Sequence, residues 1–131
     1  MGIKLPANVV KLIEGKNFGH LATIMPDGSP QVSPVWVDYN GGLVLVNTAE
    51  GRVKPRNVRR DKRVAISIAD QNNPYSMASI RGKVVEITEK GADAHIDKLA
   101  KKYLGKDKYP WKKPGDKRVI LKIEPLHLAT Q

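Results

Sequence analysis

Apolar and polar residues alternate along most of this chain with the period of two that is typical of β-strands. Turn signals separate these stretches, most clearly Asp27-Gly28 and Asn40-Gly41-Gly42, which favour tight hairpins. The pattern therefore predicts strands joined mainly by short connections, in a mostly antiparallel order. Six strands are expected, over residues 18–24, 31–39, 43–46, 64–69, 75–89 and 118–128.

Helical spacing of apolar residues is confined to two longer stretches, residues 6–14 and residues 92–104. A short basic helical turn is also expected after the third strand. Because strands and helices do not alternate as in parallel α/β folds, the helices are expected to be peripheral. The sequence thus predicts a mainly β fold, a six-stranded antiparallel split β-barrel that forms a single domain over residues 1–131.

Two residues are expected to interrupt the regular strand pattern. Pro34 lies within the second predicted strand and has no backbone N–H to donate, so it indicates a sheet edge, a bulge or a bend around a barrel. Gly82 lies within the long fifth strand, where a glycine is typical of a bulge or a bend. Polar loops are predicted over residues 70–74 and 106–117.

A strongly basic segment follows the third strand. Residues 51–63 contain seven basic side chains and one acid, Asp61. Thr48 and Gly51 can present a hydroxyl and approachable backbone N–H groups to an anion, while Arg52 and Lys54 add positive charge. Pro55 suits the first turn of a helix, whose N-terminus favours anions. We interpret the segment as a phosphate-binding element; the alternative is a solvated, charged connector.

Composition narrows the possible partners. The formal net charge of +10 on 131 residues indicates an anionic partner, which leaves nucleic acid, an anionic lipid surface and a phosphorylated cofactor open. Aromatic residues make up only 5% of the chain and form no RNA-binding strand signature, so nucleic acid is disfavoured. The chain has no cysteine, which excludes thiolate catalysis and fits a reducing cytoplasm. No stretch has the length and apolarity of a membrane span.

The sequence offers no convincing catalytic or metal-binding constellation. His20, His95 and His127 are far apart in the chain and have no metal-ligand spacing. We expect His20 and His127 to be structural residues within strands and His95 to be a surface group on its helix. If the protein is an enzyme, a bound cofactor is therefore expected to supply the reaction chemistry, and no catalytic side chain is assigned.

Four motifs resemble one known family. They are Gly-His-Leu-Ala-Thr at 19–23, Pro-Asp-Gly-Ser-Pro-Gln-Val-Ser-Pro-Val-Trp-Val at 26–37, Gly-Gly-Leu-Val-Leu-Val-Asn-Thr at 41–48, and Gly-Arg-Val-Lys-Pro-Arg-Asn-Val-Arg-Arg-Asp-Lys-Arg-Val at 51–64. Their order resembles the pyridoxamine 5′-phosphate oxidase-like split β-barrel proteins, a family of flavin and deazaflavin oxidoreductases. More narrowly, it resembles the branch that uses the deazaflavin coenzyme F420.

The resemblance implies a homodimer with a cofactor site at the subunit interface. Lys54, with Arg52 and Thr48, would hold the cofactor phosphate, Arg56 and Asn57 would lie beside it, and the second strand would run along the ring. It also implies hydride transfer from the reduced cofactor to a small organic acceptor such as a quinone, an unsaturated carbonyl or a tetrapyrrole. The implied cofactor-binding residues are Ser33, Pro34, Val35, Trp36, Thr48, Arg52, Lys54, Arg56 and Asn57.

Several alternatives stay open at this stage. FMN is the main competing cofactor, although a dense set of cations better suits the extended anion of the deazaflavin, which carries a phosphodiester and a glutamate tail. A cofactor-binding or nucleic-acid-binding module without catalysis is a further alternative. Trp36 is either a packing residue or part of the ring site. Tyr109 and Trp111 either reach the partner subunit's site or anchor their own loop.

Overall fold

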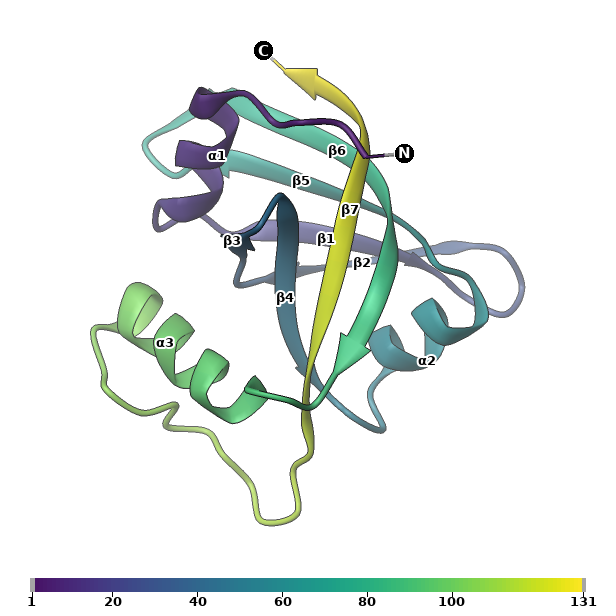
Figure 1. Ribbon diagram of the computed structural model, residues 1–131, viewed down its shortest axis with the longest axis vertical. Helices are drawn as coiled ribbons and strands as arrows, with labels where there is room; N and C mark the ends of the chain where they lie inside the picture. The colour runs from purple at the N-terminus through teal and green to yellow at the C-terminus, as the bar shows by residue number, and fades with distance from the viewer. Residues whose placement is uncertain (1, 131) are drawn as a thin grey trace.

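The computed structural model describes residues 2–130, which form a rolled antiparallel sheet with three peripheral helices (Figure 1). The helices are α1 (Ala7–Glu14), α2 (Val53–Arg60) and α3 (Ala92–Leu104). The strands are β1 (Gly19–Ile24), β2 (Pro30–Val35), β3 (Asp38–Asn40), β4 (Leu43–Ala49), β5 (Arg63–Asp70), β6 (Asn73–Thr88) and β7 (Arg118–Thr130). Their order in the sheet is β2-β1-β5-β6-β7-β4-β3, and every neighbouring pair is antiparallel, which confirms the predicted split-barrel class.

The strand predicted over residues 31–39 is in fact two strands, so the sheet has seven strands where six were predicted. β2 pairs with β1, whereas β3 pairs with β4 at the opposite edge of the sheet. The chain crosses between the two edges at residues 36–37, where the backbone N–H of Val37 donates to the hydroxyl of Tyr103 at 3.1 Å. Pro34 therefore lies in an edge strand, one of the positions that its missing N–H allows.

The bend predicted at Gly82 is confirmed. The pairing register of β6 with β7 shifts between Arg81 and Gly82. A Cβ atom on Gly82 would lie 2.2 Å from the carbonyl oxygen of Glu124 on β7. Only a residue without a side chain fits this close approach of two strands. The predicted loop over residues 70–74 is shorter than expected, because β6 already begins at Asn73 and pairs back with Asp70.

The main core fills the barrel and consists of aliphatic side chains from the long strands, with α1 and α2 packed against them. In Figure 1, α1 covers one end of the barrel, while α2 and α3 lie toward the other end, on either side of β4 and β7. A second apolar cluster joins α3, through Ile96, Leu99 and Tyr103, to Trp36 and Tyr109. This arrangement places α2, α3 and the β2–β3 crossing around one end of β4. Within residues 2–130, none of the helices is both long and apolar enough to span a bilayer.

Candidate functional site

A cavity of about 270 Å³ lies where β2, the end of β4, the start of α2 and the start of β7 meet. Its lining combines cationic, polar and apolar side chains, and no carboxylate from residues 2–130 belongs to it. The cations are Arg52, Lys54 and Arg118; the polar residues are Asn47 and Thr48; the apolar and aromatic residues are Phe18, Pro34, Val35, Trp36, Ile96, Tyr109 and Trp111. A cavity with this lining suits an anion that is attached to a flat or apolar body.

The connection from β4 to α2 places the basic residues at this cavity. β4 ends at Ala49, Gly51 adopts the left-handed conformation with φ of 86°, and α2 begins at Val53. Glu50 forms two hydrogen bonds of 2.7 Å with the guanidinium of Arg59, and this pairing ties the connection to the last turn of α2. Because the connection is held at both ends, its backbone needs little further ordering when a ligand binds.

Lys54 has the environment expected of an anion-binding lysine. It is half-buried, and its Nζ donates to the hydroxyl of Ser33 on β2. Burial lowers the pKa of Lys54, and the positive charge of Arg52 lowers it further. Among residues 2–130, no carboxylate lies within ion-pair distance of its ammonium group, so its charge is available to an anionic ligand.

Arg118 is a cation of this cavity that the sequence analysis missed. It is 6% exposed, its Nε donates to Oδ1 of Asn47 at 2.9 Å, and its guanidinium lies 5.1 Å from the ring centroid of Tyr109. Burial lowers the pKa of Arg118; Tyr109 opposes this shift, and the charge of Arg52 adds to it. In the sequence, Arg118 is merely the first residue of an apolar strand. The antiparallel register that pairs it with Ala49 brings it to the cavity.

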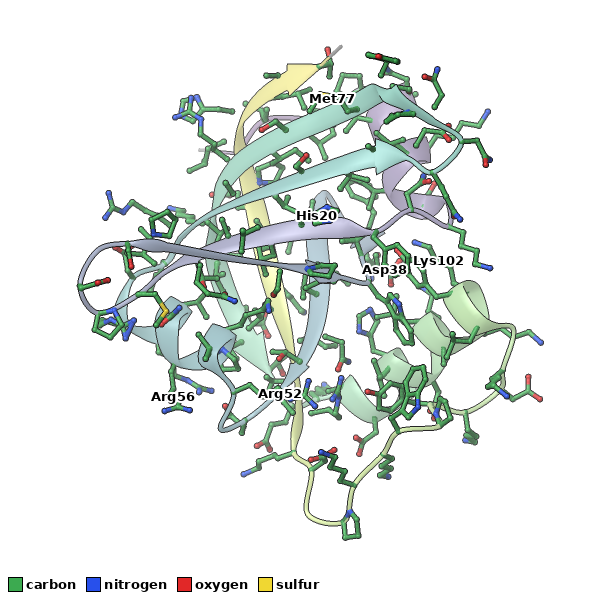
Figure 2. The ribbon with its side chains drawn as sticks, turned by 180° about the vertical axis from the view of Figure 1, so that it is seen from behind. His20, Asp38, Arg52, Arg56, Met77 and Lys102 are labelled. Carbon is green, nitrogen blue, oxygen red and sulfur yellow. The ribbon has the colours of Figure 1, made fainter. Side chains whose placement is uncertain are left out.

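The residues implied by the resemblance do not all lie at the cavity. Six of them line it, and Ser33 contacts one of those six through its bond with Lys54. Arg56 is exposed on the outer side of α2, as Figure 2 shows, and its Nη2 donates to the carbonyl of Gly51 at 2.6 Å. The six lining residues are Pro34, Val35, Trp36, Thr48, Arg52 and Lys54.

Asn57 is also outside the cavity lining, but it is buried. Its Nδ2 donates to the hydroxyl of Thr23 on β1 at 2.9 Å, and its Oδ1 accepts from Arg60 at 2.6 Å. These bonds fix α2 against β1. Asn57 thereby holds the helix that presents Lys54 to the cavity.

Aromatic side chains form one wall of the cavity. Trp36 stacks on Tyr103 with ring centroids 5.2 Å apart and an interplanar angle of 5°. Tyr109 and Trp111 pack against Trp36 at 6.0 and 6.4 Å, so both line the cavity of their own chain. Trp111 is nevertheless 59% exposed, which leaves much of its ring available to a ligand or to a second chain. Trp36 therefore packs within the fold and borders the cavity at the same time.

The histidines differ from expectation. His95, predicted to be a surface group, is buried, and its Nε2 lies 3.0 Å from Oδ2 of Asp38. His20 and His127, predicted to be structural, have exposed side chains. His95 lies four residues before Leu99, so helical spacing already places it on the buried face of α3, where Asp38 of β3 contacts it. No cluster of three or more metal-binding side chains occurs among residues 2–130.

Asp38, labelled beside Lys102 in Figure 2, is a buried carboxylate whose charge depends on its hydrogen bonds. Burial by itself opposes the charge. Bonds from the His95 ring, the backbone N–H of Tyr39 and the Lys98 ammonium outweigh it and lower the pKa of Asp38 well below its ordinary value of 3.8. The folded chain therefore binds this proton less readily than the unfolded chain does.

Acid stability is expected to depend on Asp38. Because its pKa is lowered on folding, its contribution to stability is complete above about pH 4 and is lost as the pH falls below that value. We expect Asp38→Asn to flatten the fall in unfolding free energy below pH 4 by at most about 1.4 kcal/mol per pH unit. Urea unfolding between pH 2.5 and 6 measures the unfolding free energy of each protein as a function of pH. Asp107→Asn, at an exposed carboxylate, serves as the control. If the unfolding free energy of wild type, Asp38→Asn and Asp107→Asn fell with the same slope below pH 4, the expectation would be contradicted.

Comparison with known proteins relates this fold and cavity to a family. Residues 5–131 match the family model described as pyridoxamine 5′-phosphate oxidase. The solved structure of an F420 reductase is 33% identical, covers 97% of this chain and 100% of its own, and superposes with a TM-score of 0.84. Two further structures are less than 25% identical and show a common fold alone.

The first of these two is a protein of Listeria innocua, 19% identical over 93% of this chain and 94% of its own, with a TM-score of 0.70. The second is a conserved protein of Mycobacterium tuberculosis, 22% identical over 97% of this chain and 84% of its own, with a TM-score of 0.69.

Proposed function

This chain belongs to the pyridoxamine 5′-phosphate oxidase family, and from that premise we propose that it is an oxidoreductase that transfers a hydride from reduced coenzyme F420 to a small organic acceptor. One observation carries the proposal. A single cavity brings together Lys54, Arg52 and Thr48, without an opposing carboxylate from residues 2–130, beside an edge strand and an aromatic wall. These are the features that a phosphorylated ring cofactor requires of its site.

The residues present fit such a cofactor. Lys54 has only a hydroxyl partner for its ammonium group, and buried Nη1 of Arg118 has no hydrogen-bond partner at all within the described structure. Leaving charged donors unpaired in a partly buried place costs free energy, which an anionic ligand would recover. β2 pairs with β1 on one side only, so its other edge can offer backbone groups to the polar edge of a ring.

In this proposal the chain's own residues bind the cofactor and orient it toward the acceptor. Lys54, Arg52 and Thr48 hold the phosphate, while β2 from Ser33 to Val35 and the following Trp36 border the ring. The cofactor, when bound, supplies the hydride from its ring carbon. The wall formed by Trp36, Tyr109 and Trp111 would border the place where the acceptor approaches and orient it.

The choice of coenzyme F420 over FMN rests on charge and on the relative named an F420 reductase. Coenzyme F420 carries a phosphodiester and a glutamate tail, so its negative charges are spread along a chain. Three cations line the cavity, one on each of the β4–α2 connection, α2 and β7. Such a spread of cations suits an extended anion better than the single terminal phosphate of FMN.

We further propose a homodimer in which the partner subunit completes the site, acting in the cytoplasm. The exposed ring of Trp111 and the exposed Phe18, both at the cavity, are apolar surface that a second chain would cover. The absence of cysteine supports a reducing compartment. The acceptor would occupy the same cavity, beside the aromatic wall.

The deciding experiment is a titration of the purified chain with coenzyme F420, FMN and FAD, followed by the fluorescence of Trp36 and Trp111. We expect coenzyme F420 to bind most tightly, because it offers the most negative charges to the cavity. Tighter binding of FMN would retain the phosphate site and move the chemistry to ordinary flavin redox. Binding of none of the three, with salt-dependent binding of duplex nucleic acid, would overturn the proposal.

A further inference from the structure

A partly buried chain of hydrogen bonds runs from Lys98 on α3 to the cavity. It starts at Asp38, which accepts from Lys98 at 3.1 Å, and continues to Nε2 of His95 at 3.0 Å. Nδ1 of His95 lies 3.2 Å from Nδ2 of Asn47, and Oδ1 of Asn47 accepts from Nε of Arg118 at 2.9 Å. The chain therefore ends at a guanidinium that lines the cavity.

The direction of each bond in this chain can be deduced. Arginine only donates, so the atom of Asn47 that faces Arg118 must be the amide oxygen. The amide nitrogen then donates its two hydrogens to the carbonyl of Ala92, at 2.9 Å, and to Nδ1 of His95. Nδ1 must be an acceptor, so the ring carries its proton on Nε2 and donates it to Asp38. Each group in the chain is therefore assigned as a donor or an acceptor at every bond. The orientation of the Asn47 amide is fixed by its three partners, Ala92, His95 and Arg118.

The guanidinium at the end of this chain has an unused donor. Arg118 is more than nine-tenths buried, and its Nη1 has no hydrogen-bond partner in the described structure. Buried charged donors without partners are rare, because each one costs free energy. A guanidinium that lines the cavity, that is held at Nε by a dedicated network, and whose Nη1 is buried without a partner is suited to an acceptor from outside the chain.

We propose that Arg118 is a second anion-binding residue of the cavity, and that Asp38, His95 and Asn47 are positioning residues that hold its guanidinium toward the ligand. The group it binds is an anionic oxygen of a carboxylate or a phosphate, separate from the phosphate assigned to Lys54. This inference rests on the proposed function only for the identity of the whole ligand. The anion site itself follows from the unpartnered guanidinium.

Small anions test the binding role without the cofactor. Inorganic phosphate and succinate are titrated separately into the wild-type chain and into Arg118→Gln, with the fluorescence of Trp36 and Trp111 as the signal. We expect the variant to weaken binding of at least one anion about tenfold or more, as for loss of a charged hydrogen bond. Lys117→Gln is the matched control, since it removes the same charge from the exposed neighbouring residue and is expected to change affinity less than about twofold.

The outcomes separate the possible ligand groups. Loss of succinate binding assigns a carboxylate to Arg118, and loss of phosphate binding assigns a phosphate; either result supports the proposal. Equal effects of the two substitutions, or a wild-type chain that binds neither anion, would overturn it. A chain that binds anions through Arg118 but binds no coenzyme F420 would refute the proposed function alone.

A double-mutant cycle tests the positioning role. Asn47→Ala and His95→Gln are each expected to weaken anion binding about threefold or more in the wild-type background, and to add nothing in the Arg118→Gln background. If these substitutions acted only by disturbing the fold, they would weaken anion binding equally in the wild-type and Arg118→Gln backgrounds. That result would contradict the positioning role. Two substitutions are used so that the cycle can be completed even if one of the variants does not fold.

Discussion

Lys54→Ala is expected to weaken binding of the anionic cofactor by about 2 kcal/mol or more, which is about thirtyfold in the dissociation constant. The reason is the surroundings of the ammonium group. It is half-buried, it is held by the hydroxyl of Ser33, and no carboxylate from residues 2–130 neutralises it. A charged contact in such a place is worth more than a contact on the open surface, where water and salt screen it. Titration with coenzyme F420 and with FMN measures the loss.

The control for Lys54→Ala is Lys62→Ala. Lys62 belongs to the same basic segment but is exposed beyond the end of α2, away from the cavity lining. Its removal lowers the net charge by the same amount, so it measures the general attraction of an anion to a basic chain. We expect Lys62→Ala to change the dissociation constant less than about threefold. A Lys54→Ala variant that binds as tightly as wild type would contradict the phosphate assignment.

Local sequence patterns predicted most of the barrel, because strand alternation and hairpin turns are set by neighbouring residues. The division of residues 31–39 was not predictable in this way. Its apolar pattern continues through Trp36 without a break, and the division depends on which strands the two halves pair with. β2 forms one edge of the sheet and β3 forms the other. Pairing with strands that are far away in the sequence cannot be predicted from a local pattern of apolar residues.

The residues of the cavity could likewise be predicted only where they are close together in the sequence. Thr48, Arg52 and Lys54 could be found together because they are close in sequence, at the end of β4 and just after it. Arg118 and Asn47 are 71 residues apart, and His95 and Asp38 are 57 apart, so only the folded sheet brings each pair into contact. A buried arginine at the start of a strand has no distinctive local signal. We propose a binding role for Arg118 because of its unpartnered nitrogen and not because of its position in the sequence.

Helix geometry could have refined one assignment from the sequence alone. Arg56 lies two residues after Lys54 in α2, and two residues correspond to a rotation of about 200° around a helix axis. The two side chains therefore point to opposite sides, and Arg56 is exposed whereas Lys54 faces the cavity. Asn57, three residues after Lys54, shares its side of the helix and is buried against Thr23.

Gly82→Ala is expected to destabilise the fold by about 3 kcal/mol, among the largest effects of any single substitution in this chain. The new Cβ atom would lie 2.2 Å from the carbonyl oxygen of Glu124 and 3.1 Å from its carbonyl carbon. Both are backbone atoms of β7, so relief requires the two longest strands of the barrel to separate at the bulge. Replacing glycine elsewhere can stabilise a protein by up to about 1 kcal/mol through the unfolded chain, which is too little to offset this contact.

Gly2→Ala is the matched control, because its new Cβ atom would approach the same residue in a different way. It would lie 2.8 Å from Cγ of Glu124, an atom of a partly exposed side chain that can turn aside. We therefore expect Gly2→Ala to change the unfolding free energy by less than about 0.5 kcal/mol. Urea unfolding gives both values, and the midpoint of Gly82→Ala should fall while its slope stays that of wild type. Equal midpoints for the two variants would mean that the β6–β7 bulge yields without cost, and that its tight strand contact does not determine the stability of the barrel.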